Sequence, residues 1–153
     1  MTVKTNPDPK QPPGERILVC GPPAAGKSTW VRSQARPGDQ VIDFDALCRT
    51  LGSRSHHDHP PHVRALAKSM RRSLEEQATT HPGRTFVIRS LADPSDRAAV
   101  AERLGARVVM FAVPAAEALE RARGDNRPEW TDQAIRSWWD RYRPSPADES
   151  PET

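Results

Sequence analysis

The chain has 153 residues, and its 23 lysines and arginines exceed its 20 aspartates and glutamates to give a net charge of +3. This length fits a single domain with one modest core, and the small basic excess suits an anionic substrate without requiring nucleic acid. No apolar stretch is long enough to span a membrane, and we expect no signal peptide. The predicted location is therefore the cytoplasm. The sequence implies no contact with a membrane and no protein partner. The two cysteines, Cys20 and Cys48, show no metal-ligand spacing and are predicted to be reduced thiols.

Both ends of the chain are rich in proline and poor in apolar side chains. Residues 1–15 hold four prolines, and residues 144–153 hold three prolines among acidic residues. Neither segment buries enough apolar surface to offset the entropy lost on ordering. We therefore predict a disordered tail over 1–15, a folded domain over 16–143 and a second disordered tail over 144–153.

Residues 21–28 carry the G-x-x-x-x-G-K-S pattern of a phosphate-binding P-loop. An apolar strand is predicted over 16–20 and a helix over 27–35, which is the context that this motif needs. Backbone N–H groups in such a loop point at a phosphate, and the helix N-terminus adds partial positive charge. Lys27 is expected to bind the β- and γ-phosphates of ATP, and the Ser28 hydroxyl to bind Mg²⁺. The predicted nucleotide-binding residues are Gly21, Pro22, Pro23, Ala24, Ala25, Gly26, Lys27, Ser28 and Thr29.

Two acidic residues follow the next predicted strand, which spans residues 40–43. Asp43 and Asp45 are two residues apart, so their carboxylates share one side if the strand geometry persists. One can accept a proton from an acceptor hydroxyl while the other helps to hold Mg²⁺; the alternative is that either one caps the following helix. Arg49, one helical turn further on, is predicted to contact an acceptor phosphate or these carboxylates, with a plain surface position as the alternative.

Four of the five histidines lie in the polar loop over 53–62, at His56, His57, His59 and His62. One interpretation is a metal site. Their spacing matches no zinc pattern, which favours a solvated loop near the substrate opening.

A helix is predicted over 63–78, because apolar residues from Val63 to Leu74 recur at helical spacing. Arg64, Lys68 and Arg71 share the opposite face. That face is either solvated or a wall of the acceptor groove that attracts a polyanion.

Strands are also predicted over 85–89 and 107–113, and helices over 94–104, 114–123 and 131–142. Asp93 and Pro94 form a helix start, and the aromatic stripe of the last helix is interpreted as core packing. Residues 121–130 are predicted to form a lid over the P-loop. The arginines of this lid are Arg121, Arg123 and Arg127. They would neutralise charge on the transferred phosphoryl group. The alternative is that they are there only because positive charge stabilises the C-terminus of a helix.

Strands that alternate with helices predict an α/β fold: a three-layer sandwich with a short parallel sheet of four or five strands, order 2-3-1-4, and helices on both faces. The active site then lies at the carboxyl ends of the strands. The third strand runs into Arg89 where many P-loop hydrolases have an acidic residue. This favours a small kinase over a motor or switch ATPase.

Three blocks of the chain match the motifs of one known family in residue type and spacing. They are residues 26–30, residues 41–45 with Arg49, and residues 111–121 with 134–137. Over residues 16–143 the layout resembles the kinase domain of phage polynucleotide 5′-kinases, which are small P-loop kinases.

This resemblance implies a phage or bacterial enzyme that moves the γ-phosphate of ATP, with Mg²⁺, to the 5′-hydroxyl of a polynucleotide or nucleotide-like acceptor. It implies that Asp45 is the general base and that Arg121, with Arg123 or Arg127, forms the lid. Two departures bear on the acceptor: Arg49 comes one residue later than in the family, and Arg89 replaces an acid on the third strand. We predict Lys27, Asp43, Asp45 and Arg121 as catalytic, and Arg49, Arg64 and Lys68 as acceptor contacts. The Asp43–Asp45 pair also resembles shikimate- and gluconate-type kinases, and a nucleotide-binding or ATPase module of a larger assembly is a further alternative.

Overall fold

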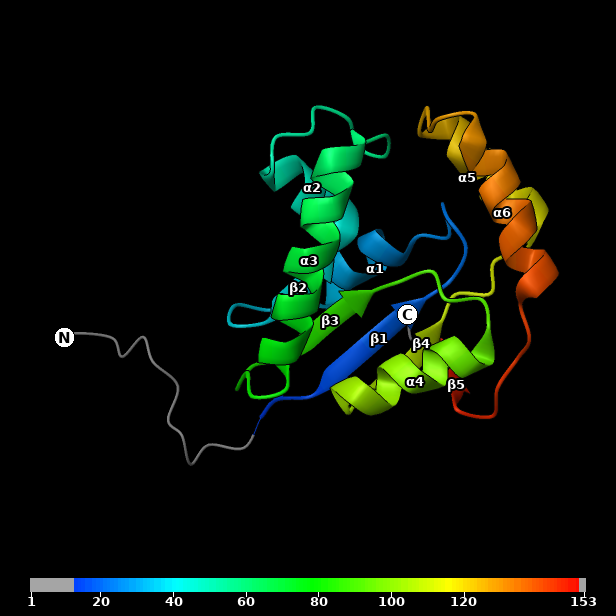
Figure 1. Cartoon of the computed structure of the whole chain (residues 1–153). Helices are drawn as coiled ribbons and strands as arrows, with labels where there is room; N and C mark the ends of the chain where they lie inside the picture. The colour runs from blue at the N-terminus through cyan, green and yellow to red at the C-terminus, as the bar shows by residue number, and fades with distance from the viewer. Residues whose placement is uncertain (1–12, 152–153) are drawn as a thin grey trace.

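The computed structural model describes residues 13–151, so residues 1–12 of the predicted N-terminal tail lie outside the described part (Figure 1). The elements follow in the order β1 (Arg16–Cys20), α1 (Lys27–Gln34), β2 (Gln40–Asp43), α2 (Phe44–Thr50), α3 (Pro61–Ala78), β3 (Thr85–Ile88), α4 (Pro94–Leu104), β4 (Arg107–Met110), α5 (Ala115–Gly124), α6 (Trp130–Arg141) and β5 (Asp148–Glu149).

The strands form one parallel sheet in the order β2-β3-β1-β4-β5. The predicted order 2-3-1-4 is confirmed, and β5 adds a fifth strand beside β4. Leu18 of β1 pairs with Val87 of β3 and Val108 of β4, while Ile42 of β2 pairs with Val87. These four buried side chains run in one row across the sheet, as in a sheet that is covered on both faces.

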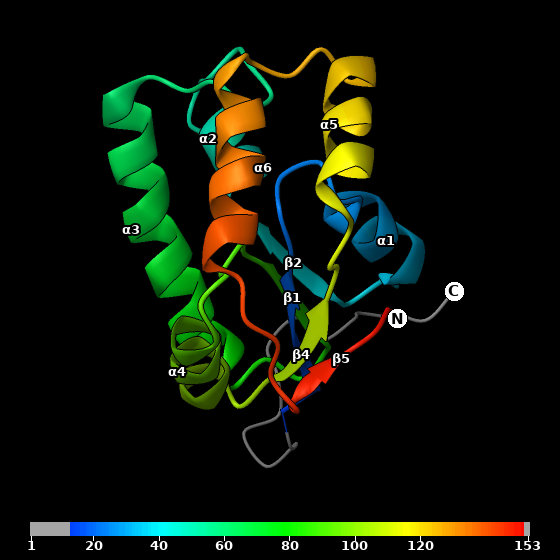
Figure 2. The same ribbon diagram turned by 90° about the vertical axis from the view of Figure 1, so that its right-hand side faces the viewer.

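Helices cover both faces of the sheet, which confirms the predicted three-layer α/β fold (Figures 1 and 2). On one face Val19 and Phe86 pack in a cluster with Val31 of α1. On the other face the row of Leu18 and Val87 packs with Ala78 of α3, Leu104 of α4 and Trp138 of α6. Residues of opposite strand parity therefore make two separate halves of the core.

The apolar stripe of α3 lies somewhat differently from its prediction. Val63 and Ala67 are buried, but Leu66 is 57% exposed, and Glu75 and Ala78 complete the buried face. The stripe of α6 is as predicted, because Ile135 and Trp138 are buried and Tyr142 stacks on Trp138 with ring centroids 4.7 Å apart.

Residues 144–151 are ordered by an ion pair, in place of the disordered tail expected there. Arg97 of α4 is buried and donates from Nε and Nη2 to the two carboxylate oxygens of Asp148, at 3.2 and 2.8 Å. Arg97 Nη2 also donates to the carbonyl of Arg143. The composition of this segment predicted disorder because it has few apolar side chains. The bidentate ion pair between Asp148 and the buried Arg97 guanidinium holds the segment in place without them.

Replacing Asp148 with asparagine should lower the free energy of unfolding by about 3 kcal/mol, because it leaves the buried Arg97 guanidinium without a countercharge. Urea denaturation followed by circular dichroism measures this loss. Glu149→Gln on the same strand is the matched control: its ion pair with Arg107 is exposed, so a change within about 1 kcal/mol is expected. Equal losses for the two variants would show that the pairing of Arg97 does not hold β5.

Two further expectations concern the state of the cysteines and the presence of a membrane-spanning helix. Cys20 and Cys48 are buried and free of a disulfide, and burial raises the pKa of Cys20 to about 12, so that it stays a thiol at neutral pH. Within residues 13–151, each helix is too short or too polar to cross a membrane.

Candidate active site

A cleft of about 1390 Å³ opens at the carboxyl ends of the central strands. It is lined by the P-loop after β1, the acidic pair after β2, the segment after β3, part of the histidine-rich loop, and the end of α5 with the turn that follows. Segments far apart in the sequence therefore meet at the sheet edge where the topology predicted the active site.

The P-loop is held in the shape that its glycines permit. Gly26, at the start of α1, has a φ of 90°, and a Cβ there would lie 2.8 Å from Arg121 Nη1. Lys27 Nζ donates to the carbonyl oxygen of Gly21 at 2.6 Å. Burial, with the charge of Arg127 as a smaller contribution, lowers the pKa of Lys27 to about 8. Of the predicted nucleotide contacts, Pro23 through Thr29 line the cleft, whereas Gly21 and Pro22 are buried and are not among the lining residues.

The acidic pair lies at a strand-to-helix junction. Strand geometry does not carry on through both residues, because β2 ends at Asp43 and α2 begins at Phe44. The alternative that one of the two acids caps the following helix holds for Asp43. Asp43 is the N-cap of α2 and accepts a hydrogen bond from the backbone N–H of Asp45 at 3.2 Å. Both residues nevertheless line the cleft, and burial, followed by the charge of Asp45, raises the pKa of Asp43.

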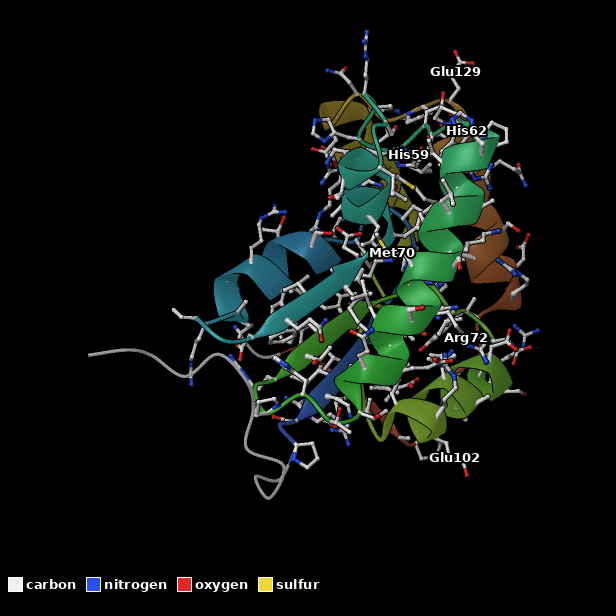
Figure 3. All side chains as sticks on the ribbon, turned by 60° about the vertical axis from the view of Figure 1, so that its left-hand side comes forward. His59, His62, Met70, Arg72, Glu102 and Glu129 are labelled. Carbon is white, nitrogen blue, oxygen red and sulfur yellow. The ribbon has the colours of Figure 1, made fainter. Side chains whose placement is uncertain are left out.

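Two histidines hold the carboxylate of Asp45. His59 Nε2 lies 2.7 Å from Oδ1 and His57 Nδ1 lies 3.1 Å from Oδ2. The other ring nitrogen of His59 lies 2.6 Å from the Ser53 hydroxyl, and the His59 side chain is only 2% exposed. Figure 3 marks His59 in the loop before α3 and His62 at the start of that helix.

The composition of this loop suggested that it is solvated, but part of it belongs to the site. His62 is exposed outside the cleft lining and His56 is exposed at the cleft, whereas His57 and His59 contact the Asp45 carboxylate. Burial lowers the pKa of His57, as does the charge of Arg127. Among residues 13–151 no group of three or more histidine, cysteine, aspartate and glutamate side chains is arranged to hold a metal ion. The sequence alone did not predict the contact of His57 and His59 with Asp45. The only signal for it was that the histidine-rich loop follows Asp45 closely in the chain.

The arginines of the predicted lid differ in position. Arg121 Nη1 donates to the P-loop carbonyl of Ala25 at 2.8 Å, and Nη2 to Glu117 at 3.1 Å. Arg127 lines the cleft, and in the described part of the chain its buried Nε has no hydrogen-bond partner. Arg123 is exposed and is not among the residues that line the cleft.

The fit to ATP and Mg²⁺ can be judged from these groups. The buried Nε of Arg127 lies 3.8 Å from Asp125 Oδ2 but makes no hydrogen bond within the described residues, and beside a glycine cradle and Lys27 it fits the oxygens of a polyphosphate. Ser28 and Asp43 line the same cleft and supply the hard oxygen ligands that Mg²⁺ prefers.

Arginines from α2, α3 and the end of β3 also line the cleft. Arg49 is exposed and donates to the carbonyl of His56 at 3.5 Å, while Arg71 and Arg89 line the wall made by α3 and the end of β3. Arg64 and Lys68 are exposed on α3 and are not among the lining residues. The sequence did not single out Trp130, an indole that is 52% exposed at the cleft.

Solved structures that are similar to this chain at low sequence identity include several kinases. A gluconokinase from Sinorhizobium meliloti 1021 is 19% identical, with 92% of this chain and 83% of that chain covered and a TM-score of 0.60. Shikimate kinase from Acinetobacter baumannii, solved with shikimate, is 22% identical, with coverage of 83% and 75% and a TM-score of 0.55. A chain of the Pnkp1/Rnl/Hen1 RNA repair complex is 12% identical with a TM-score of 0.63; 93% of this chain is covered but only 49% of that one, so the present chain spans about half its length.

These likenesses show that the chain has the fold of small P-loop kinases. No curated protein sequence matches the chain. A family model described as an AAA domain matches residues 17–145, which is most of the 153 residues. The chain therefore belongs to the AAA domain family AAA_33.

Proposed function

We propose that the protein is an ATP-dependent phosphotransferase that moves the γ-phosphate to a hydroxyl acceptor. The observation that carries this proposal is the carboxylate of Asp45, held by two histidines in the same cleft as the P-loop. A P-loop alone supports nucleotide binding. A positioned carboxylate across from it supplies the base that transfer to an alcohol uses and that ATP binding does not need.

The proposed reaction assigns one task to each group. Asp45 accepts the proton of the acceptor hydroxyl while the acceptor oxygen bonds to the γ-phosphorus. The bond between that phosphorus and the β–γ bridging oxygen breaks, and ADP leaves with its electron pair. Lys27, Arg121 and Arg127 stabilise the negative charge on the phosphates. Ser28 and Asp43 would hold Mg²⁺, which when bound neutralises phosphate charge.

We propose a polynucleotide or nucleotide-like molecule with a free 5′-hydroxyl as the acceptor. Arg71 lines the cleft, and Arg64 and Lys68 precede it at helical spacing on the same face of α3. A longer nucleic acid could follow that basic strip out of the cleft. The exposed Trp130 offers a surface on which a base can stack, and Arg49 offers a contact for an acceptor phosphate.

A small-metabolite kinase is the second candidate. It is favoured by the fold shared with a gluconokinase and with a shikimate kinase that was solved with its acceptor. The nucleotide-binding or ATPase module is a third, and it requires ATP turnover that does not depend on an acceptor.

A transfer screen with γ-labelled ATP and Mg²⁺ tests the proposal. Oligonucleotides with a 5′-hydroxyl, nucleosides and small polyols or hydroxy acids are offered in parallel, and ATP turnover is measured without acceptor. We expect label on the nucleotide-type acceptors. Label only on small metabolites would favour the second candidate, and equal ATP turnover with and without every acceptor would favour the third.

The histidine contact gives a separate prediction. His59→Ala removes a buried hydrogen bond to the Asp45 carboxylate, and such bonds to charged groups contribute about 1.5–3 kcal/mol. We expect kcat to fall by roughly 10- to 100-fold, with the KM for ATP unchanged because the P-loop is untouched. Steady-state kinetics with the best acceptor from the screen measures both.

Two further variants show whether His59 acts by positioning Asp45. His59→Gln keeps an N–H donor and should restore much of the lost kcat. His62→Ala removes an exposed histidine near the start of α3 and should behave like the wild type. A KM for ATP that rises along with the fall in kcat would point to general disruption rather than to loss of positioning.

A further inference from the structure

A buried glutamate holds an arginine at the end of β3. Glu75 of α3 has a side chain that is 2% exposed, and it accepts hydrogen bonds from Arg89 at 3.2 Å and Arg103 at 2.8 Å. Burying a carboxylate without such partners would cost several kcal/mol. Arg89 itself is 18% exposed and lines the cleft. The guanidinium is therefore fixed to the wall instead of extending freely into solvent.

Arg71 lies beside this pair without a countercharge of its own. It is half-buried on α3, and its guanidinium carbon lies 5.4 Å from the centre of the Phe44 ring. Within residues 13–151 no hydrogen bond or ion pair satisfies its guanidinium. Burial lowers the pKa of Arg71, and the charge of Arg89 acts in the same direction. Three arginines thus surround one carboxylate, so that this wall of the cleft carries unbalanced positive charge.

The sheet order places this charge near the proposed chemistry. Since β3 lies between β2 and β1, the end of β3 lies between Asp45, which follows β2, and the P-loop, which follows β1. Arg71 and Arg89 line the same cleft as Asp45 and Lys27. An acceptor whose hydroxyl meets Asp45 therefore has the rest of its structure within reach of these arginines.

We propose that Arg71 and Arg89 form an oxyanion-binding subsite, so that the preferred acceptor carries a phosphate or carboxylate on the same molecule as its reacting hydroxyl. This inference rests on the proposed phosphotransferase function and narrows its acceptor. A planar guanidinium binds either oxyanion through two parallel hydrogen bonds. The donors of Arg71 are uncommitted, while Arg89 is already oriented by Glu75.

Matched acceptors test the subsite. Thymidine 3′-phosphate and thymidine offer the same 5′-hydroxyl with and without an anion, and glycerate and glycerol do so for a carboxylate. We expect the wild type to prefer the charged member of a pair. Arg71→Gln should raise KM for that member by about 10- to 100-fold and leave KM for the neutral one unchanged. Arg72→Gln, the exposed neighbour on the same helix, should change neither. The pair with the larger preference identifies phosphate or carboxylate as the group bound.

A binding measurement separates failure of the subsite from failure of the kinase proposal. Calorimetry follows thymidine 3′-phosphate and glycerate binding to protein whose donor site is filled with a non-hydrolysable ATP analogue. Because Arg89→Gln alone leaves the buried Glu75 with Arg103 as its only ion-pair partner, Arg89 is tested as Arg89→Gln with Glu75→Gln, after the thermal unfolding of this double variant is checked.

Each outcome then decides something. Equal wild-type rates on charged and neutral acceptors overturn the subsite and leave the transferase standing. No transfer to any acceptor overturns the transferase. Calorimetry then decides the subsite alone: anion binding that Arg71→Gln weakens supports it, and binding that is absent or indifferent to Arg71→Gln overturns it.

Discussion

Replacing Asp45 with asparagine should lower kcat for phosphate transfer by about 10²- to 10⁴-fold, the usual contribution of a positioned general base. Asparagine keeps the size of the side chain, and its carbonyl oxygen can still accept the hydrogen bond from His59. It cannot take the proton of an acceptor hydroxyl at neutral pH. Single-turnover transfer from labelled ATP measures the loss, and fluorescence titration with a labelled ADP should give an unchanged dissociation constant.

Asp58→Asn is the matched control for that experiment. Asp58 is an exposed acid in the same loop as His57 and His59, with no contact to the cleft. Its substitution changes the net charge by the same amount, so it reports the effect of charge without the base. Full transfer activity in Asp45→Asn would remove the proposed mechanism, whatever the control shows.

Replacing Arg121 with alanine should reduce kcat by at least about 10²-fold, because it removes a guanidinium that contacts the P-loop where phosphate charge changes during transfer. Stopped-time assays with labelled ATP measure this loss. Arg127→Ala should also be impaired, since Arg127 lines the cleft and its buried Nε makes no hydrogen bond within the described chain. Arg121→Lys keeps the positive charge but loses the planar guanidinium that can donate two parallel hydrogen bonds, so partial activity is expected.

Two other arginines, Arg123 and Arg136, serve as controls for the Arg121→Ala experiment. Arg123 is on the same helix as Arg121 but is exposed and away from the cleft lining, so we expect the smallest loss of the three from Arg123→Ala. Arg136→Ala, on the exposed side of α6, reports general effects of losing a positive charge. A larger loss in Arg123→Ala than in Arg121→Ala would mean that the lid closes differently from the proposal.

The local sequence was sufficient for much of the fold. The P-loop lies within one strand, one turn and one helix start, so its residues and their order suffice to specify it. Asp93 and Pro94 mark the start of α4 in the same way, and the side chain of Asp93 accepts from Ser95 N–H as a cap does. The alternation of strands and helices, with a P-loop on the first strand, then led to a parallel sheet whose order 2-3-1-4 is confirmed.

What only the tertiary structure decided are the contacts between distant segments. Asp45 and His59 are 14 residues apart, Arg97 and Asp148 are 51 apart, and Arg121 and Ala25 are 96 apart. The sequence identified Asp45, Ala25 and Arg121 as site candidates and placed Asp148 in a tail. It did not single out Arg97, and it did not give the partner of any of these residues. Whether an arginine is solvated, paired with a buried carboxylate or left facing a cleft depends on which side chains the fold brings within hydrogen-bond distance. That distance is fixed by packing across the sheet, which no local pattern encodes.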